Sequence, residues 1–285
     1  MKNIFDNFTL ILISHKSKKK VKKFILELTK DIKIIVIENS NDTSIKEEIE
    51  KENFNTKVYI IENNGYAGSI NFARSVIKTD YFLVSNPDVE NINKSVIKKF
   101  LENAKKLNNN FACLGPRYTN ISAKTLIQSD INKEVDVIPS ISGAVMFFYK
   151  KKFDFINGFD DNFFLYFEET DYCYRARKKG LKSYQLNTLK VKHDVGTSVE
   201  IKNNKEKKEL KDLHIWHYVW SKFYFHKKHY GFIISLIYFL PTIIRTIFKI
   251  SFFKIFKNKE KLNKYKLRYQ GLTCSIKGKN SYKRI

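Results

Sequence analysis

The sequence predicts an α/β fold: a mostly parallel sheet covered by helices, followed by a helical region rich in basic and aromatic residues. Short β-branched runs alternate with amphipathic stretches from residue 8, and these runs are apolar on both faces, as in a buried parallel sheet. Of the net charge of +24, about +17 lies within residues 202–285. We therefore expect one domain over residues 1–200 and a separate helical region over residues 201–285.

The first third of the chain reads as strand, helix, strand, helix, strand, over residues 8–14, 19–30, 32–38, 44–52 and 56–62. The elements expected after these are a strand at 81–84, a helix at about 93–107, a strand around 111–115, a strand, turn and strand within 135–151, and a long helix at about 206–229. Ligands of such sheets bind beyond the carboxyl ends of the strands. The residues directly after each strand should therefore carry the function.

Polar segments of specific composition follow four of the expected strands: "SHKS", "ENSND", "ENNGYAGSIN" and "SNPDV". The third segment places Gly65 and Gly68 at the start of a helix, where backbone N–H groups can face a phosphate. It is not a Walker loop, because no Gly-Lys-Ser/Thr follows. Taken alone, a glycine turn that only joins a strand to a helix is an equally good interpretation.

Three carboxylates, Glu168, Glu169 and Asp171, fall within four positions directly after the aromatic run "FFLYF". The helix dipole favours acids in a first turn, so a solvated helix start is the simplest interpretation. On a helix, however, Glu169 shares a face with Cys173 and Ala176, and the aromatic run would hold it against an apolar wall. Desolvation there raises the pKa of a carboxyl group, which suits a general base.

Asp88 follows an expected strand in an Asn-Pro-Asp triplet, where Pro87 stiffens the turn and the carboxylate can meet a divalent cation. An aspartate in a turn is ordinarily no more than a turn residue. Together with a base at Glu169, however, it matches a known chemical need. Transfer from a diphosphate donor requires charge neutralisation on the leaving group and a base on the incoming hydroxyl.

The chain resembles the family 2 glycosyltransferases with the GT-A fold, a Rossmann-like nucleotide-diphospho-sugar transferase domain, and within that family the bacterial rhamnosyltransferases. The resemblance covers roughly residues 8–200. It rests on motifs that occur in the family's order: "VIENSNDTS" resembles the nucleotide loop, "NNGYAGSINFA" the glycine-containing donor segment, "NPDV" the metal-binding aspartate motif, "GFDDNFFLYFEETDYCYRARKKG" the acceptor-side acidic motif, and "VKHDVGTS" the segment of a late histidine.

The resemblance implies a role for each matching residue. Glu169 takes the position of the catalytic base, where the family usually has aspartate. The residues implied in acceptor-side support are Gly143, Glu168 and Asp171. The implied metal ligands are Asp88 and His193, although a histidine that ends a strand is more often structural. The residues implied in donor binding are Ser14, Glu38, Asn39, Asn64, Gly65, Gly68, Asn71, Asn86 and Asp88.

The implied reaction is an inverting, single-displacement transfer with Mg²⁺ or Mn²⁺ as cofactor. Glu169 takes a proton from an acceptor hydroxyl, which attacks the anomeric carbon as the nucleoside diphosphate leaves. The resemblance favours dTDP-rhamnose as the donor. Transfer of a hexose or N-acetylhexosamine from a UDP donor is the alternative within the same family.

The apolar stretch from residue 231 has an uncharged run of about 14 residues before Arg245, short of the roughly 20 needed to span a bilayer. Basic residues then recur through Lys257, as in a basic helix that lies in a membrane interface. A buried core helix with snorkelling lysines is the alternative. We expect a peripheral protein on the cytoplasmic face of the bacterial inner membrane, using a polyprenyl-diphosphate-linked glycan acceptor in surface polysaccharide synthesis.

Two other classes stay open. The basic and aromatic tail also suits single-stranded nucleic acid, but its apolar stretch has no use on a phosphate backbone, so no nucleic-acid partner is expected. An inactive family member retained as a partner subunit would show the same motifs. The cysteines, Cys113, Cys173 and Cys274, form neither a disulfide framework nor a metal pattern, and the N-terminus lacks a secretory signal, so a reducing cytosolic compartment fits best.

Overall fold

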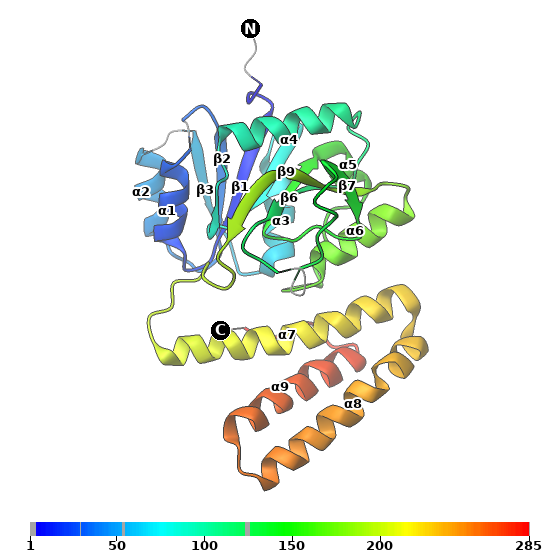
Figure 1. The fold of residues 1–285 in the computed structure, drawn as a ribbon. Coiled ribbons are helices and arrows are strands. Elements are labelled where there is room, and N and C mark those ends of the chain that lie inside the picture. The colour runs from blue at the N-terminus through cyan, green and yellow to red at the C-terminus, as the bar shows by residue number, and fades with distance from the viewer. Residues whose placement is uncertain (1–3, 29, 53–54, 123–125, 285) are drawn as a thin grey trace. The chain divides into compact units, whose positions relative to one another are not determined.

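A computed structural model describes residues 4–28, 30–52, 55–122 and 126–284. The chain divides into two compact units (Figure 1). The first unit combines residues 1–160 with 169–200, and the second combines residues 161–168 with 201–285. The aromatic segment 161–168 therefore belongs with the helical region, although the sequence placed it inside the domain over residues 1–200.

The described residues of the first unit form a nine-stranded mixed sheet. Its strands are β1 (Phe8–Ser14), β2 (Lys33–Glu38), β3 (Thr56–Ile60), β4 (Tyr81–Ser85), β5 (Val89–Glu90), β6 (Leu114–Tyr118), β7 (Val135–Ile138), β8 (Val145–Tyr149) and β9 (Ser183–His193). They follow the order β3-β2-β1-β4-β8-β6-β9-β5, and β7 pairs with β9 off this path. Strands β1 to β4 are parallel, so their carboxyl ends share one edge of the sheet.

The helices of this part are α1 (Lys18–Leu26), α2 (Ser44–Glu52), α3 (Gly65–Val76), α4 (Lys94–Lys106), α5 (Lys150–Phe155) and α6 (Glu168–Lys178). Alternate residues of β1 point to opposite faces of the sheet. Leu10 and Leu12 pack in a core with α1, α2 and α4, whereas Ile11 and Ile13 pack in a second core with α3, α5 and α6. Helices on both faces explain why β1 and β2 read as continuous apolar runs.

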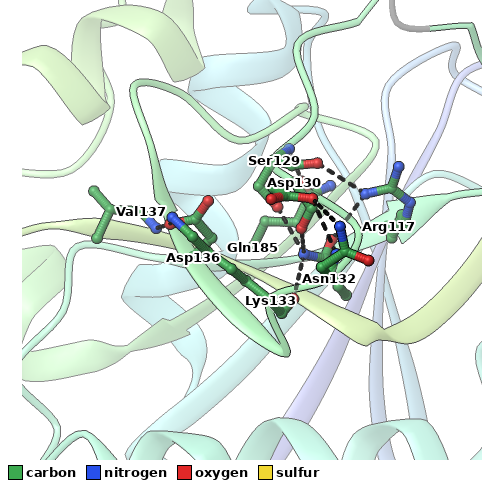
Figure 2. Close-up of polar contacts among 9 residues, drawn as sticks. Arg117, Ser129, Asp130, Asn132, Lys133, Asp136, Val137 and Gln185 are labelled. Carbon is green, nitrogen blue, oxygen red and sulfur yellow. Dashed lines mark hydrogen bonds and ion pairs between the residues drawn. The ribbon is translucent and has the colours of Figure 1, made fainter.

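Strand β9 is irregular where it passes β6. Pro116 pairs with Leu186 but Arg117 pairs with Lys190, so residues 187–189 bulge out of the ladder. The bulge frees Asn187, whose Nδ2 donates to Ser129 Oγ and to the carbonyl oxygens of Asp130 and Lys133 at 2.7–2.8 Å. Figure 2 shows this loop folded over Arg117 and Gln185. These bonds fix the loop before β7, which then pairs with β9.

The described residues of the second unit form the helices α7 (Asn204–Tyr230), α8 (Phe232–Ile255) and α9 (Lys259–Ile276). Trp216 and Trp220 of α7 pack with Leu267 of α9. At Gly271 an added Cβ would lie 2.4 Å from the backbone oxygen of Trp216, so only glycine allows this close approach of α9 to α7. The sequence did not predict α9, because its mixed polar residues give no clear apolar stripe.

Helix α8 is apolar and largely exposed. By length and composition it is the one helix among the described residues that could cross a membrane, and only 17% of its most apolar segment is buried. The alternative of a buried core helix is therefore wrong. That α8 lies in a membrane interface without spanning the bilayer stays a prediction. Its exposed large side chains include Ile233, Ile234, Ile237, Tyr238, Leu240, Ile244, Ile247, Phe248 and Ile255.

Candidate active site

Glu38 ends β2 at the carboxyl edge of the parallel strands, and it is 1% exposed. Its Oε2 accepts a hydrogen bond from Ser14 Oγ at 2.5 Å, and its Oε1 accepts one from the Ser40 N–H at 2.5 Å and another from the Ser40 hydroxyl. Both carboxylate oxygens are thus held by donors of the chain. Ser14 and Glu38 lie together as expected, and their contact with a nucleotide stays a prediction.

Asn39 connects the end of β2 to the first turn of α3. Its Nδ2 donates to Ser69 Oγ at 3.1 Å, and Ser69 Oγ donates to the carbonyl oxygen of Gly65 at 2.8 Å. On its other side, Asn39 Oδ1 lies 2.8 Å from His15 Nδ1. Sequence reasoning did not single out His15 or Ser69, although both lie in the segments "SHKS" and "ENNGYAGSIN". Their position in segments that follow strand ends was the signal that could have identified His15 and Ser69.

Gly65 begins α3 with φ +79°, a conformation that favours glycine at this sharp entry into the helix. Asn64, the residue before it, makes no side-chain capping bond to the helix. The next residue, Tyr66, donates its hydroxyl hydrogen to the carbonyl oxygen of Gly143. The start of α3 is therefore tied to the turn before β8, which brings Gly143 beside this segment. Phosphate binding at this helix start, with Gly68 one turn along, stays a prediction.

Asn71 of α3 binds the backbone of Phe159 through its side-chain amide. Its Nδ2 donates to the carbonyl oxygen of Phe159 at 2.9 Å, and its Oδ1 accepts from the N–H of Phe159 at 3.0 Å. Because both ends of the amide hold the backbone before the acidic motif, the observed contacts of Asn71 position the chain. Its expected role in donor binding stays untested.

Asp88 lies in the turn between β4 and β5, with 6% of its surface exposed. The Asn86 N–H donates to the Ala144 carbonyl at 2.9 Å, which fixes the start of this turn. Pairing of β5 with β9 sets Val89 opposite His193, and His193 Nε2 lies 3.3 Å from Asp88 Oδ1. The structure therefore brings together the two residues expected to ligate a metal.

The carboxylate of Asp88 fits a cation. In the part of the chain that the structure describes, neither of its oxygens accepts a hydrogen bond. A buried carboxylate without donors is costly unless a positive charge faces it, and carboxylate oxygen and imidazole nitrogen are both ligands of divalent metals. No group of three or more histidine, cysteine, aspartate or glutamate side chains among the described residues could hold a metal by itself. A metal here would thus take further ligands from a bound diphosphate or from water.

Glu169 lies in the first turn of α6 and is half-buried. Burial raises the pKa of its carboxyl group from 4.5 to about 7, and hydrogen bonds from the backbone of Glu169 and Thr170 offset part of this effect. Near neutral pH the group is thus available both as a carboxylate and as an acid, as a general base requires. The apolar environment expected from its helix face supports this interpretation.

Asp171 is fully buried and accepts a hydrogen bond from Arg175 Nε at 2.7 Å. The other nitrogens of Arg175 donate to the carbonyl oxygens of Ile156 and Gly158. Asp171 thus orients an arginine that secures the loop after α5. Glu168, at the first position of α6, is also buried. For both residues, support of an acceptor stays a prediction.

The family is decided by comparison with known proteins. The family model for glycosyl transferase family 2 matches residues 9–231. The chain belongs to this family. It is a glycosyltransferase, as the motifs after the strands led us to expect. It is 21% identical over 215 residues to the low-salt glycan biosynthesis hexosyltransferase Agl10 of Haloferax volcanii, covering 67% of this chain and 68% of that protein.

Solved structures show that this glycosyltransferase has the GT-A fold. A mannosyltransferase of Pyrobaculum calidifontis, in complex with GDP-Man and Mn²⁺, superposes with a TM-score of 0.60 at 9% identity over 96% of this chain and 88% of the other. GalNAc-T7 with UDP, GalNAc and Mn²⁺ gives a TM-score of 0.55 at 13% identity over 77% of this chain. This glycosyltransferase spans about half, 49%, of the GalNAc-T7 chain.

Replacing Glu169 by glutamine should stabilise the protein in a pH-dependent way. A pKa raised from 4.5 to about 7 means that the folded chain holds this proton more tightly than the unfolded chain, so stability is lost as the pH rises across this range. Glutamine removes the half-buried charge. We expect Glu169→Gln to raise Tm by a few degrees at pH 8 and by clearly less at pH 5.

The matched control is Glu90→Gln, which removes one exposed carboxylate from β5 and should change Tm equally little at both pH values. Thermal unfolding followed by circular dichroism measures both variants. A Glu169→Gln variant that is less stable than the native chain at pH 8 would contradict the raised pKa.

Proposed function

We propose that this family 2 glycosyltransferase catalyses inverting, metal-assisted transfer of a sugar from a nucleoside diphosphate donor to an acceptor hydroxyl. The observation that carries the proposal is the buried Asp88 carboxylate, which lies beside His193 and accepts no hydrogen bond from the described residues. A divalent cation held by these two residues would neutralise the charge that develops on the leaving diphosphate.

The chain's own residues supply the other parts of the reaction. Glu169, with a pKa near 7, takes the proton from the acceptor hydroxyl, and this oxygen forms the new bond to the anomeric carbon. The bond between that carbon and the diphosphate oxygen breaks in the same step, which inverts the anomeric configuration. A single carboxylate base is sufficient, because no covalent glycosyl-enzyme intermediate has to form.

The donor is proposed to lie over the carboxyl edge of β1 to β4. Ser14, Glu38 and Asn39 form a fixed hydrogen-bonded group there, and Asn39 is tied through Ser69 to the start of α3. Backbone N–H groups at a helix start favour an anionic ligand, which suits the diphosphate. The preorganised group should orient the nucleoside with little rearrangement.

The motifs favour dTDP-rhamnose as the sugar donor. A hexose donor is the second candidate, because the relative from Haloferax volcanii is named a hexosyltransferase and the two structural neighbours contain GDP-Man or UDP. Mn²⁺ in both neighbours supports a divalent cation in this enzyme as well.

The acceptor is proposed to be a glycan linked to a polyprenyl diphosphate, reached at the cytoplasmic face of a membrane. The exposed apolar face of α8 and its basic residues, such as Arg245 and Lys249, match the acyl region and the anionic headgroups of a bilayer. Within the described residues, the other helices have no comparable row of exposed large apolar side chains.

Donor binding should depend on both the cation and Asp88. We expect dTDP with Mn²⁺ to raise Tm, EDTA to abolish that rise, and Asp88→Asn to weaken dTDP binding at least tenfold while keeping the shape of the side chain. UDP, GDP and CDP are compared in the same thermal-shift assay, and Glu90→Gln serves as the control for loss of one charge.

The result separates the candidates. A metal-dependent shift with UDP or GDP alone would replace the rhamnose donor with a hexose donor. No shift with any nucleotide, or shifts unaffected by EDTA and by Asp88→Asn, would contradict the proposed donor site.

Membrane association should require the exposed face of α8. Ile237 and Ile244 are 67% and 60% exposed and lie on one side of the helix. We expect Ile237→Glu with Ile244→Glu to reduce binding to vesicles containing phosphatidylglycerol at least tenfold in a flotation assay, because two charged side chains cannot enter the acyl region. The control, Leu26→Glu with Ile131→Glu, alters similarly exposed apolar residues of the first unit. Equal losses in both variants would refute the role of α8.

A further inference from the structure

The second unit contains a pocket that the transfer reaction described above does not use. Its volume is about 270 Å³, and it lies between the segment 161–168, α7 and α9. The residues that line it are Tyr166, His214, Ile215, Tyr218, Val219, Lys264 and Arg268. All of them belong to the second unit. The pocket therefore exists within the helical part of the chain.

One wall of this pocket is cationic. Lys264 and Arg268 lie one turn apart on α9, and no carboxylate lines the pocket. Among the described residues neither side chain forms an ion pair, whereas Lys211, one turn before His214 on α7, binds Glu260, one turn before Lys264 on α9. The Nε of Arg268 is buried and has no hydrogen-bond acceptor within the described part of the chain. A buried guanidinium donor without an acceptor is costly, so this wall indicates an anionic ligand.

The opposite wall is aromatic. The ring of Tyr166 lies 5.6 Å from that of Tyr218 and 5.8 Å from that of His214, in both cases edge to face. Burial lowers the pKa of His214, so its imidazole is neutral at physiological pH and adds no charge to the two cations. Ile215 and Val219 complete this side with apolar surface. The pocket thus joins a cationic wall to an apolar and aromatic one.

The backbone of the aromatic segment is strained where it forms this wall. Tyr166 and Phe167 have φ values of 69° and 70°, in the left-handed region that residues other than glycine rarely adopt. Such a conformation persists only where its surroundings hold it.

Three contacts within the second unit hold the strained segment. Ser221 Oγ donates to the carbonyl oxygen of Leu165 at 2.7 Å, Arg284 stacks over the ring of Phe164 at 3.7 Å, and the ring of Phe167 packs against Phe225. The segment is thus clamped to α7 and to the C-terminal residues. These contacts fix Tyr166 as a wall of the pocket.

We propose that this pocket binds the diphosphate of an isoprenoid-linked acceptor, with Lys264 and Arg268 on the phosphoryl oxygens and the aromatic wall beside the first isoprene unit. Two cations that form no ion pair among the described residues match the charge of a diphosphate. Helix α8, whose exposed face is apolar, packs against α7 through Phe223 and Phe239, so the lipid chain would enter a unit that already has a lipid-compatible surface. The inference rests on the proposed function, because it assigns the acceptor of that reaction to a site.

The chain sequence supports a link to the reaction. Only Phe167 and Glu168 separate Tyr166 of the pocket from the proposed base Glu169. An acceptor anchored at its diphosphate would present a hydroxyl of its glycan to the reaction while the anchor stays fixed. Binding energy from this nonreacting part of the substrate would then position the reacting hydroxyl.

The test uses isothermal titration calorimetry on the full chain with EDTA, which removes the metal required at the donor site. The probes are farnesyl diphosphate, inorganic pyrophosphate and farnesol. We expect farnesyl diphosphate to bind, pyrophosphate to compete with it, and farnesol not to bind. Lys264→Gln with Arg268→Gln should weaken farnesyl diphosphate binding at least tenfold. The control, Lys259→Gln with Lys266→Gln, removes two exposed charges from the same helix and should bind as the native chain does.

Three results would overturn the inference: equal binding to the native chain and the pocket variant, tighter binding of pyrophosphate than of farnesyl diphosphate, or displacement of farnesyl diphosphate by a single-stranded oligonucleotide. The nucleotide-dependent Tm shift with Mn²⁺ is measured on the same variants. If the Tm shift persists but farnesyl diphosphate does not bind in the pocket, the proposed transfer stands without this acceptor site. If neither the native chain nor any variant shows the Tm shift, the proposed function itself fails.

Discussion

The cost of removing a carboxylate from water is the constraint that organises the candidate active site. Glu38 meets this cost with hydroxyl and N–H donors, and Asp171 meets it with Arg175. The oxygens of Asp88 accept no hydrogen bond from the described residues and lie beside His193, and burial raises the pKa of Glu169. The first two groups are satisfied and stabilise their loops. Asp88 is left to bind a cation, and Glu169 is left to take up a proton. Transfer from a diphosphate donor requires both of these functions.

Local sequence patterns predicted the parallel strands β1 to β4 and the polar residues at their ends, since alternation of apolar runs and strand-end composition are short-range signals. The desolvation that raises the pKa of Glu169 agrees with the apolar helix face expected for it from the sequence. Short-range patterns could not predict that His193 approaches Asp88, which only the family resemblance implied, because pairing of β5 with β9 joins residues far apart in the chain. The bulge at Asn187 and helix α9 were likewise missed, since both depend on packing against distant elements.

The second unit has apolar residues both in its core and on an exposed face. Its core is formed by aromatic side chains of α7 with residues of α8 and α9, and the outer face of α8 is left exposed. Two parts of the tail's charge excess are the basic residues along α8 and the pair on α9 that lines the pocket. A lipid-linked acceptor would use both, because its chain requires an apolar surface and its diphosphate requires cations. Free nucleic acid would leave the face of α8 without a function.

The claim on which the account depends is that Glu169 removes the acceptor proton. The most direct test is the single-turnover rate of transfer as a function of pH, measured with a saturating donor and Mn²⁺. The account predicts a rate that rises tenfold per pH unit below about 7 and then levels off, and a loss of about 100-fold or more in Glu169→Gln. A rate independent of pH in this range, or a Glu169→Gln variant with near-native transfer, would contradict it.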